Sequence, residues 1–155
     1  METCRRYLLP SILVLTTLTA AACSRRVHYV LPDDYVGIIK IVLDEKNGLD
    51  VKQQNRTYTL EVPEDGVLRL KSFELFDPYH ETIFTKKNGT EIPGFDAPDD
   101  IIAFRDTIFR HVSGGLTTAI TIIGTKKQTE QIREDMSNQP FVDVEPAVYN
   151  QRFRK

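Results

Sequence analysis

The chain has almost no cysteine. Its 155 residues include only Cys4 and Cys23, on either side of an N-terminal apolar run. If that run is removed, Cys4 leaves with it, and a single cysteine cannot close a disulfide within the remaining domain. The folded part must therefore be held together by packing, and a chain of this length can bury a sizeable core.

Tryptophan is absent, and neither sign of charge is in excess. The chain has 20 basic and 22 acidic side chains, with a formal net charge of -2. Because a nucleic-acid-binding domain presents a strongly basic surface, we expect no nucleic-acid partner. Phosphate-binding and dinucleotide-binding loops are missing as well, so we expect no cofactor. The lack of tryptophan argues against a broad aromatic platform for sugars.

The N-terminal residues follow the order of a secretory signal, with charge first, an apolar run second and small residues last. Arg5 and Arg6 precede the run from Tyr7 to Ala22. This run is too short and too interrupted for a comfortable transmembrane helix, which needs about 20 apolar residues. Three alanines stand directly before Cys23, an arrangement that resembles a bacterial lipobox, although Ala20 occupies a position where leucine is usual.

The lipobox resemblance implies that residues 1–22 are a signal peptide and that Cys23 receives a diacylglycerol and an acyl chain such as palmitate. Two or more acyl chains anchor a protein stably, because each buried CH₂ contributes roughly 0.8 kcal/mol. Ser24, in place of Asp, favours the periplasmic side of the outer membrane in a host with two membranes. An ordinary secretory signal or an uncleaved anchor are the alternatives. We expect a bacterial envelope protein that contacts the membrane through Cys23.

Residues 28–136 are predicted to form one domain rich in strands, after a short tether at 23–27. Residues Tyr35–Leu43 are apolar on both faces except at Lys40, which predicts a central strand covered on both sides. Gly37 within it indicates a bulge or a close backbone approach. The last segment, 137–155, is polar and contains two prolines, so we expect a flexible tail.

The middle of the domain predicts a hairpin. Residues Thr57–Val62 alternate, with Tyr58, Leu60 and Val62 facing the core. Pro63–Gly66 is a tight-turn sequence, and Val67–Leu70 is expected to return as the second arm.

Two further strands and a helix are expected near the C-terminal end of the domain. Leu116–Ile123 reads as a strand, and residues 101–111 as a strand or a short helix, with strand favoured by their Phe, Ile and Thr content. Thr125 and Gln128 form a capping-box pattern that predicts a helix at Lys126–Met136. The sequence therefore predicts a mainly β fold, an antiparallel β-sandwich of about seven strands with one short C-terminal helix.

Three stretches, residues 29–39, 58–68 and 123–128, resemble an uncharacterised family of short bacterial lipoproteins that is known only as a domain of unknown function. The resemblance covers most of the chain from His28 to about Glu134. It implies a lipoprotein and assigns no catalytic residues. The strands and the Pro-Glu-Asp-Gly turn are also similar to transthyretin-like β-sandwiches, a likeness of fold alone.

These observations favour a non-enzymatic binding or structural module of unknown ligand at the membrane surface. The competing hypothesis is an enzyme or metal-dependent protein whose site is assembled from loops carrying His80, Asp99 and His111. The histidines have no short ligand spacing, so such a site requires convergence in space. Asp96, Asp99 and Asp100 are a weaker calcium candidate. A third possibility is a partner of another envelope protein, which an exposed apolar patch or unpaired strand edge would indicate.

Overall fold

The computed structural model describes residues 25–76, 80–112, 115–137 and 144–153. The expected signal peptide, residues 1–22, and the expected lipidation site, Cys23, lie outside the described residues. Within the described ranges, no helix has both the length and the apolar character needed to cross a bilayer.

The described residues form seven strands, the number predicted, together with two α-helices and one short 3-10 helix. Ala103–Val112 is a strand, which confirms the favoured prediction for residues 101–111 from Ala103 onward, and Ile101 and Ile102 precede the strand. The first strand begins at Arg25, inside the segment expected to be a tether. The elements in chain order are β1 (Arg25–Leu31), β2 (Gly37–Leu43), β3 (Thr57–Glu61), β4 (Val67–Leu70), η1 (Glu74–Phe76), β5 (His80–Lys86), β6 (Ala103–Val112), β7 (Gly115–Gly124), α1 (Lys126–Ser137) and α2 (Pro146–Phe153).

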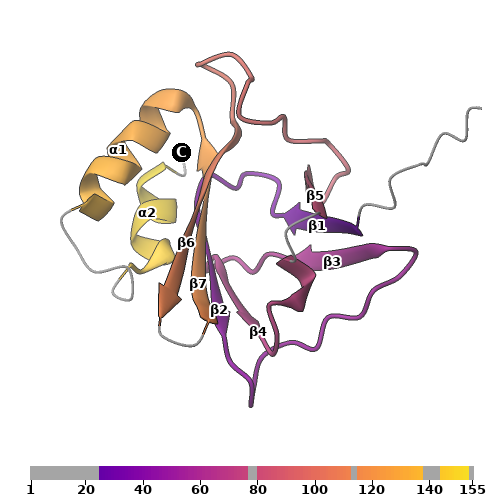
Figure 1. The fold of residues 1–155 in the computed structure, drawn as a ribbon. Helices are drawn as coiled ribbons and strands as arrows, with labels where there is room; N and C mark the ends of the chain where they lie inside the picture. Colours follow the sequence, from indigo (N-terminus) through magenta and orange to yellow (C-terminus); the bar gives the residue numbers. More distant parts are fainter. Residues whose placement is uncertain (1–24, 77–79, 113–114, 138–143, 154–155) are drawn as a thin grey trace, which may run out of the picture.

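Two sheets and a pair of helices form three layers (Figure 1). One sheet has the strand order β3-β1-β5 and the other β4-β2-β7-β6. The four-stranded sheet is the middle layer, with the three-stranded sheet on one side and α1 and α2 on the other (Figure 1). β2 lies between β4 and β7, which confirms the prediction of a central strand.

The prediction of a purely antiparallel sandwich is wrong. β1 pairs in parallel with β3 and with β5, and β2 pairs in parallel with β4. Pairing is antiparallel between β2 and β7 and between β6 and β7. The cause is the path of the chain: β1 to β5 alternate between the two sheets, so each strand returns to its own sheet through a crossover that restores its direction.

The predicted hairpin between Thr57–Val62 and Val67–Leu70 is wrong for the same reason. Its turn is real, since the Gly66 N–H donates to the Pro63 carbonyl at 2.9 Å and Gly66 has a φ of 75°. Such a φ suits glycine, which has no Cβ to clash. The turn, however, carries the chain from β3 in one sheet to β4 in the other.

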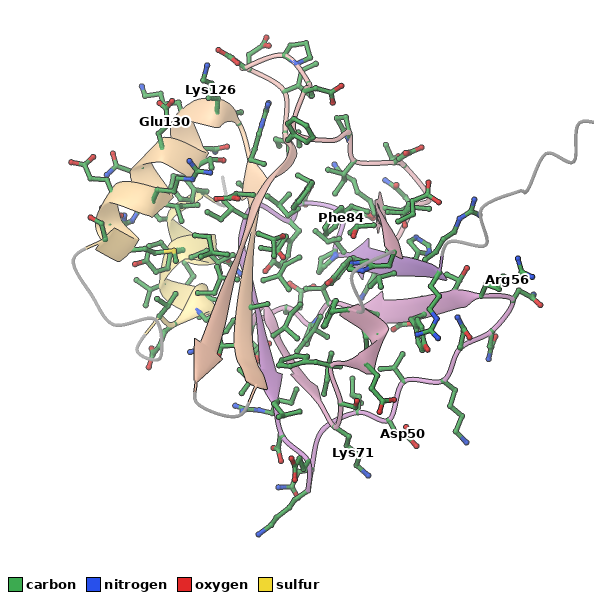
Figure 2. The ribbon with its side chains drawn as sticks, in the orientation of Figure 1. Asp50, Arg56, Lys71, Phe84, Lys126 and Glu130 are labelled. Atoms are coloured by element: carbon green, nitrogen blue, oxygen red, sulfur yellow. The ribbon has the colours of Figure 1, made fainter. Side chains whose placement is uncertain are left out.

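The main core lies between the two sheets. Leu60 and Val62 are buried there and Tyr58 packs against them, as the alternation predicted. Tyr29 of β1 stacks on Phe84 of β5 with ring centroids 4.7 Å apart, and the Phe84 side chain lies between the sheets (Figure 2). Burial raises the pKa of the Tyr29 phenol well above its usual value, because the phenolate would lose its hydration.

A second core lies between the four-stranded sheet and the helices. The predicted helix is confirmed as α1, and its capping box forms: the Thr125 N–H donates to Gln128 Oε1 at 2.8 Å and the Gln128 N–H to Thr125 Oγ1 at 3.3 Å. The residues of this core are Ile38, Ile120, Ile122, Ile132, Met136, Val144 and Tyr149.

The fold has a second helix, which the sequence analysis did not predict. α2 lies inside the segment 137–155 that was expected to be a flexible polar tail. Pro146 opens the helix, at a position where a missing N–H costs nothing. Pro146, Tyr149 and Asn150 are buried, and their spacing of three and four residues places them on one helix face, turned toward the sheet.

Candidate functional site

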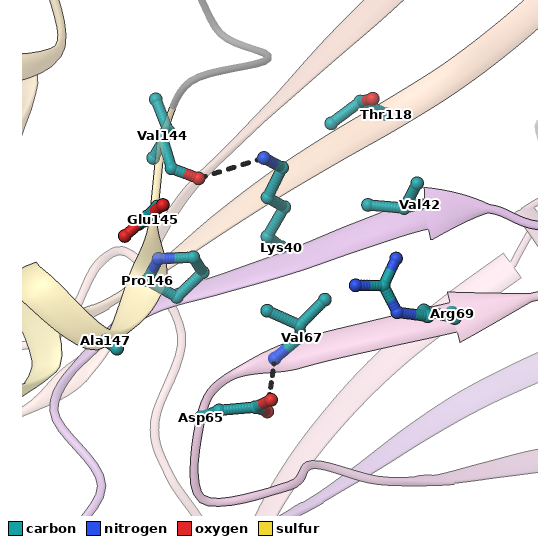
Figure 3. A pocket seen from close by; sticks show the side chains of 10 residues that line it. All are labelled: Lys40, Val42, Asp65, Val67, Arg69, Thr118, Val144, Glu145, Pro146 and Ala147. Atoms are coloured by element: carbon teal, nitrogen blue, oxygen red, sulfur yellow. Dashed lines mark hydrogen bonds between the residues drawn. The ribbon is translucent and has the colours of Figure 1, made fainter.

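The helix-side face of the four-stranded sheet is covered at one end and open at the other. Ile38 of β2 is buried under the helices, whereas Lys40 and Val42, which continue the same face, are only half-buried. A groove of about 370 Å³ lies over this open end, beside the start of α2 (Figure 3). Its lining residues are Lys40, Val42, Asp65, Val67, Arg69, Thr118, Val144, Glu145, Pro146 and Ala147.

The apolar part of the groove comes from three strands and one helix. Val42 of β2, Val67 of β4 and Thr118 of β7 are half-buried and form its floor, since the registers pair Val42 with Thr118 and place Val67 beside Lys40. Pro146 and Ala147 form a wall at the start of α2 (Figure 3). The β-branched floor residues favour the extended backbone of the strands.

Two cationic side chains, Lys40 and Arg69, border this floor. The Lys40 amine donates to the Val144 carbonyl at 2.9 Å, which ties β2 to the residue that precedes α2. Arg69 is exposed, and within the described part of the chain its guanidinium makes no hydrogen bond or ion pair. An arginine in this state has its fork of N–H donors available for a carboxylate or phosphate.

Two carboxylates lie on the other side of the groove. Asp65 accepts a hydrogen bond from the Val67 N–H at 3.0 Å, and Glu145 is exposed just before Pro146 (Figure 3). Within the described residues neither carboxylate takes part in an ion pair. The described lining includes neither histidine nor cysteine, so its chemistry suits binding by charge and apolar contact.

A buried polar cluster fixes α2 and therefore the wall of the groove. The Ile38 N–H donates to Asn150 Oδ1 at 2.7 Å, and Asn150 Nδ2 donates to the Tyr35 hydroxyl at 2.9 Å and to the Ile38 carbonyl at 3.3 Å. The Tyr35 hydroxyl also donates to the Ile38 carbonyl. The amide of Asn150 thus satisfies backbone groups that the sheet leaves open at this point.

Gly37 makes room for this cluster. Its φ is 131°, and a Cβ added there would overlap with Asn150 Oδ1. The close backbone approach predicted for Gly37 is therefore confirmed. Tyr35, Gly37 and Asn150 support the groove without lining it.

The hypothetical site of His80, Asp99 and His111 is not assembled. Asp99 lies before the start of β6, and His111 is the next-to-last residue of that ten-residue strand. At about 3.3 Å per residue, β6 separates the two by roughly 25 Å. His80 belongs to the other sheet, where its ring lies 6.0 Å from the ring of Phe76. The side chain of His111 is outside what the structure describes.

The loop with the calcium candidates Asp96, Asp99 and Asp100 is organised by Arg105 instead. The guanidinium of Arg105 donates to the carbonyls of Phe95, Ala97, Pro98 and Ile101 at 2.6–3.2 Å. These carbonyls would be the additional oxygen ligands of a calcium ion, and they are already occupied by an arginine. The Asp99 carboxylate pairs with the Lys126 amine at 3.0 Å. The described residues contain no cluster of three acidic, His or Cys side chains placed to hold a metal.

The same loop presents an exposed apolar residue. Phe95 is 73% exposed, and Ile101 in the same loop is 43% exposed. The four hydrogen bonds from Arg105 hold the loop in one arrangement around them. Single exposed apolar side chains of this kind are common on protein surfaces and do not by themselves indicate a contact surface for a partner.

The residues of the groove were not predicted from the sequence, although the sequence contains one signal of it. Lys40 is the single charge in an otherwise apolar central strand, and a charge in that position needs a polar partner or solvent. Arg69 is the corresponding charge in the shorter strand Val67–Leu70. Asn150 and Glu145 had no comparable signal, because the second helix itself was not predicted.

Comparisons with known proteins add little to this description. No family model matches the chain, and no curated protein matches it. A crystal structure of a Bacillus anthracis protein described as a lipoprotein is similar at 16% identity, with a TM-score of 0.49, over 81% of this chain and 88% of that one. A likeness of this size assigns no function. The resemblance to an uncharacterised lipoprotein family remains a prediction, and the parallel strand pairs correct the transthyretin-like, antiparallel arrangement.

Proposed function

We propose that this chain is a lipid-anchored bacterial envelope protein whose folded part is a non-enzymatic binding module. The single observation that supports binding is the groove beside Lys40, where one sheet face carries charges of both signs around an apolar floor. Concave sites with an apolar lining and a few polar groups are typical of small-ligand binding.

The anchor is proposed at Cys23, because it directly follows Ala20–Ala22 at the end of the apolar run. β1 begins at Arg25, so only Ser24 separates the proposed lipid from the first strand. A tether this short keeps the sheets close to the bilayer. A ligand or an envelope partner would therefore be met at the membrane surface, which for a host with two membranes is the periplasmic side of the outer membrane.

The anchor is tested by replacing the two cysteines separately. Cys23→Ala is expected to abolish lipidation and leave the precursor uncut, because the thiol that accepts the diacylglycerol is gone. Cys4→Ala is the matched control, since Cys4 belongs to the part that is removed. Intact-mass analysis of the membrane fraction distinguishes the two, and an unchanged mature mass for Cys23→Ala would contradict the anchor.

The groove is tested by a fragment screen on the purified protein, followed by amide chemical shifts in NMR spectra. Fragments are expected to shift the signals of Val42, Val67 and Thr118, and Val67→Trp should remove the shifts at Val42 and Thr118 by filling the floor. Circular dichroism confirms that the variant is folded. Binding that leaves these signals unchanged, or no binding at all, would refute the groove as the binding site.

A further inference from the structure

The Arg69 guanidinium lies apart from the two carboxylates of the groove. Arg69 is on β4, whereas Glu145 and Asp65 lie toward the start of α2 and the β3–β4 turn (Figure 3). The Lys40 amine lies between them, on the Val144 carbonyl. The apolar floor of Val42 and Val67 is shared by both sides. A ligand that satisfies the whole groove therefore needs one negative group, one positive group and an apolar part.

The cationic side is arranged for an anion. The register pairs Lys40 with Val67 and Val42 with Arg69, so the two cations occupy diagonal positions on one face. Lys40 is held by the Val144 carbonyl, which leaves the Arg69 guanidinium as the group able to bind a carboxylate through two N–H donors.

The acidic side is arranged for a cation. Glu145 is exposed, and the hydrogen bond from Val67 to Asp65 reduces but does not neutralise the charge of that carboxylate. Pro146 follows Glu145 directly and has no N–H, so the first residue of α2 offers Glu145 no backbone donor. A ligand ammonium is a suitable partner for Glu145.

The size of the groove limits the ligand. A volume of about 370 Å³ is near the lower end of small-molecule sites. This is space for a free amino acid or a dipeptide rather than for a long acyl or sugar chain. A dipeptide carries its ammonium and its carboxylate at opposite ends, and an aliphatic side chain supplies an apolar part beside them.

We propose that the groove binds a zwitterionic dipeptide, with its carboxylate on Arg69, its ammonium on Glu145, and its aliphatic side chain on Val42 and Val67. This proposal rests on the proposed binding function and specifies the ligand class of the same groove. It involves no covalent step.

The experiment measures the affinity of the full-length protein, in dodecyl maltoside micelles, for three probes by isothermal titration calorimetry. The probes are the dipeptide Ala-Leu, its C-terminal amide and its N-acetyl derivative. Each blocked probe lacks one charge and is expected to bind about ten-fold more weakly than Ala-Leu, as is usual when one charge-assisted hydrogen bond is lost.

Two variants assign each end of the ligand. In Arg69→Gln, amidation of the dipeptide should no longer weaken binding, because the partner of the carboxylate is already absent. In Glu145→Gln, acetylation should likewise have no further effect. Lys71→Gln and Glu45→Gln, exposed charges outside the groove lining, are the matched controls and should retain the full preference for Ala-Leu.

The outcomes separate the two proposals. Equal affinity for all three probes, or tighter binding of the acetylated one, overturns the zwitterion while the binding module stands. Loss of Ala-Leu binding in a control variant to the same extent as in Arg69→Gln also overturns it. If none of the probes binds, the zwitterion is wrong, and a failed fragment screen then removes the binding module as well.

Discussion

The two ends of the helix-side face of the four-stranded sheet belong to the same strands but differ in burial. At one end Ile38, Ile120 and Ile122 are buried under α1 and α2. At the other end Lys40 and Val42 are half-buried, Arg69 is exposed, and all three border the groove. The boundary lies where α2 begins, next to the hydrogen bond from Lys40 to Val144. The position at which α2 begins therefore determines which part of the face is buried in the core and which part lines the groove.

The largest effect is expected from a truncation at the covered end. Ile120 is fully buried, and Ile120→Ala should lower the free energy of unfolding by about 2–5 kcal/mol through lost transfer energy and a cavity. Val42→Ala, on the same face at the open end, should cost less than about 1 kcal/mol. Urea denaturation measures both, and equal losses would show that the two ends do not differ.

The next effect concerns the space that Gly37 leaves for the helix. Gly37→Ala should lower the free energy of unfolding by about 2–4 kcal/mol, because a positive φ costs an L-residue about 1–2 kcal/mol and displaced hydrogen bonds cost about as much again. Gly89→Ala is the matched control, with a φ of 87° and open space around the added Cβ. It should show the φ cost alone. If Gly37→Ala and Gly89→Ala lower the free energy of unfolding equally, the contact between residue 37 and Asn150 does not contribute to stability.

The smallest of the three effects is expected at Asn150 itself. Asn150→Leu leaves the buried Ile38 N–H without its partner, which should cost about 1–3 kcal/mol. Gln151→Leu places the same side chain at the next, exposed position of α2 and should change stability little. Amide hydrogen exchange adds a local measure, since only Asn150→Leu should speed exchange of the Ile38 amide. Unchanged exchange there would contradict the assigned hydrogen bond.

The parts of the fold that sequence predicted are those in which local pattern decides the structure. The apolar run of β2, the alternation of β3 and the capping box of α1 each depend on neighbours a few residues away. The choice of which strands pair with each other was not predictable in the same way. Nothing in Pro63–Gly66 indicates that its turn leads into a different sheet, because partner choice depends on crossovers that involve the whole chain.

The second helix and the groove were missed for related reasons. Pro146 was interpreted as a feature of a flexible tail, although proline is common in the first turn of a helix. The buried positions 146, 149 and 150 have helical spacing, but the polar Asn150 interrupts the apolar pattern that would have revealed it. Since Glu145, Pro146 and Ala147 form one wall of the groove, a site that depends on α2 could not be predicted without it.

The hydrogen bond between Ile38 and Asn150 also has a consequence for the order of synthesis. Its two residues are separated by 112 positions, and Asn150 is among the last residues that the structure describes. A ribosome delivers the strands before it delivers the helix that covers them, so a nascent chain must hold the apolar row of Ile38, Ile120 and Ile122 incompletely covered until α2 has been synthesised. During that interval the exposed row is a target for chaperones and proteases. Truncated products that lack α2 expose the same row and will be recognised in the same way.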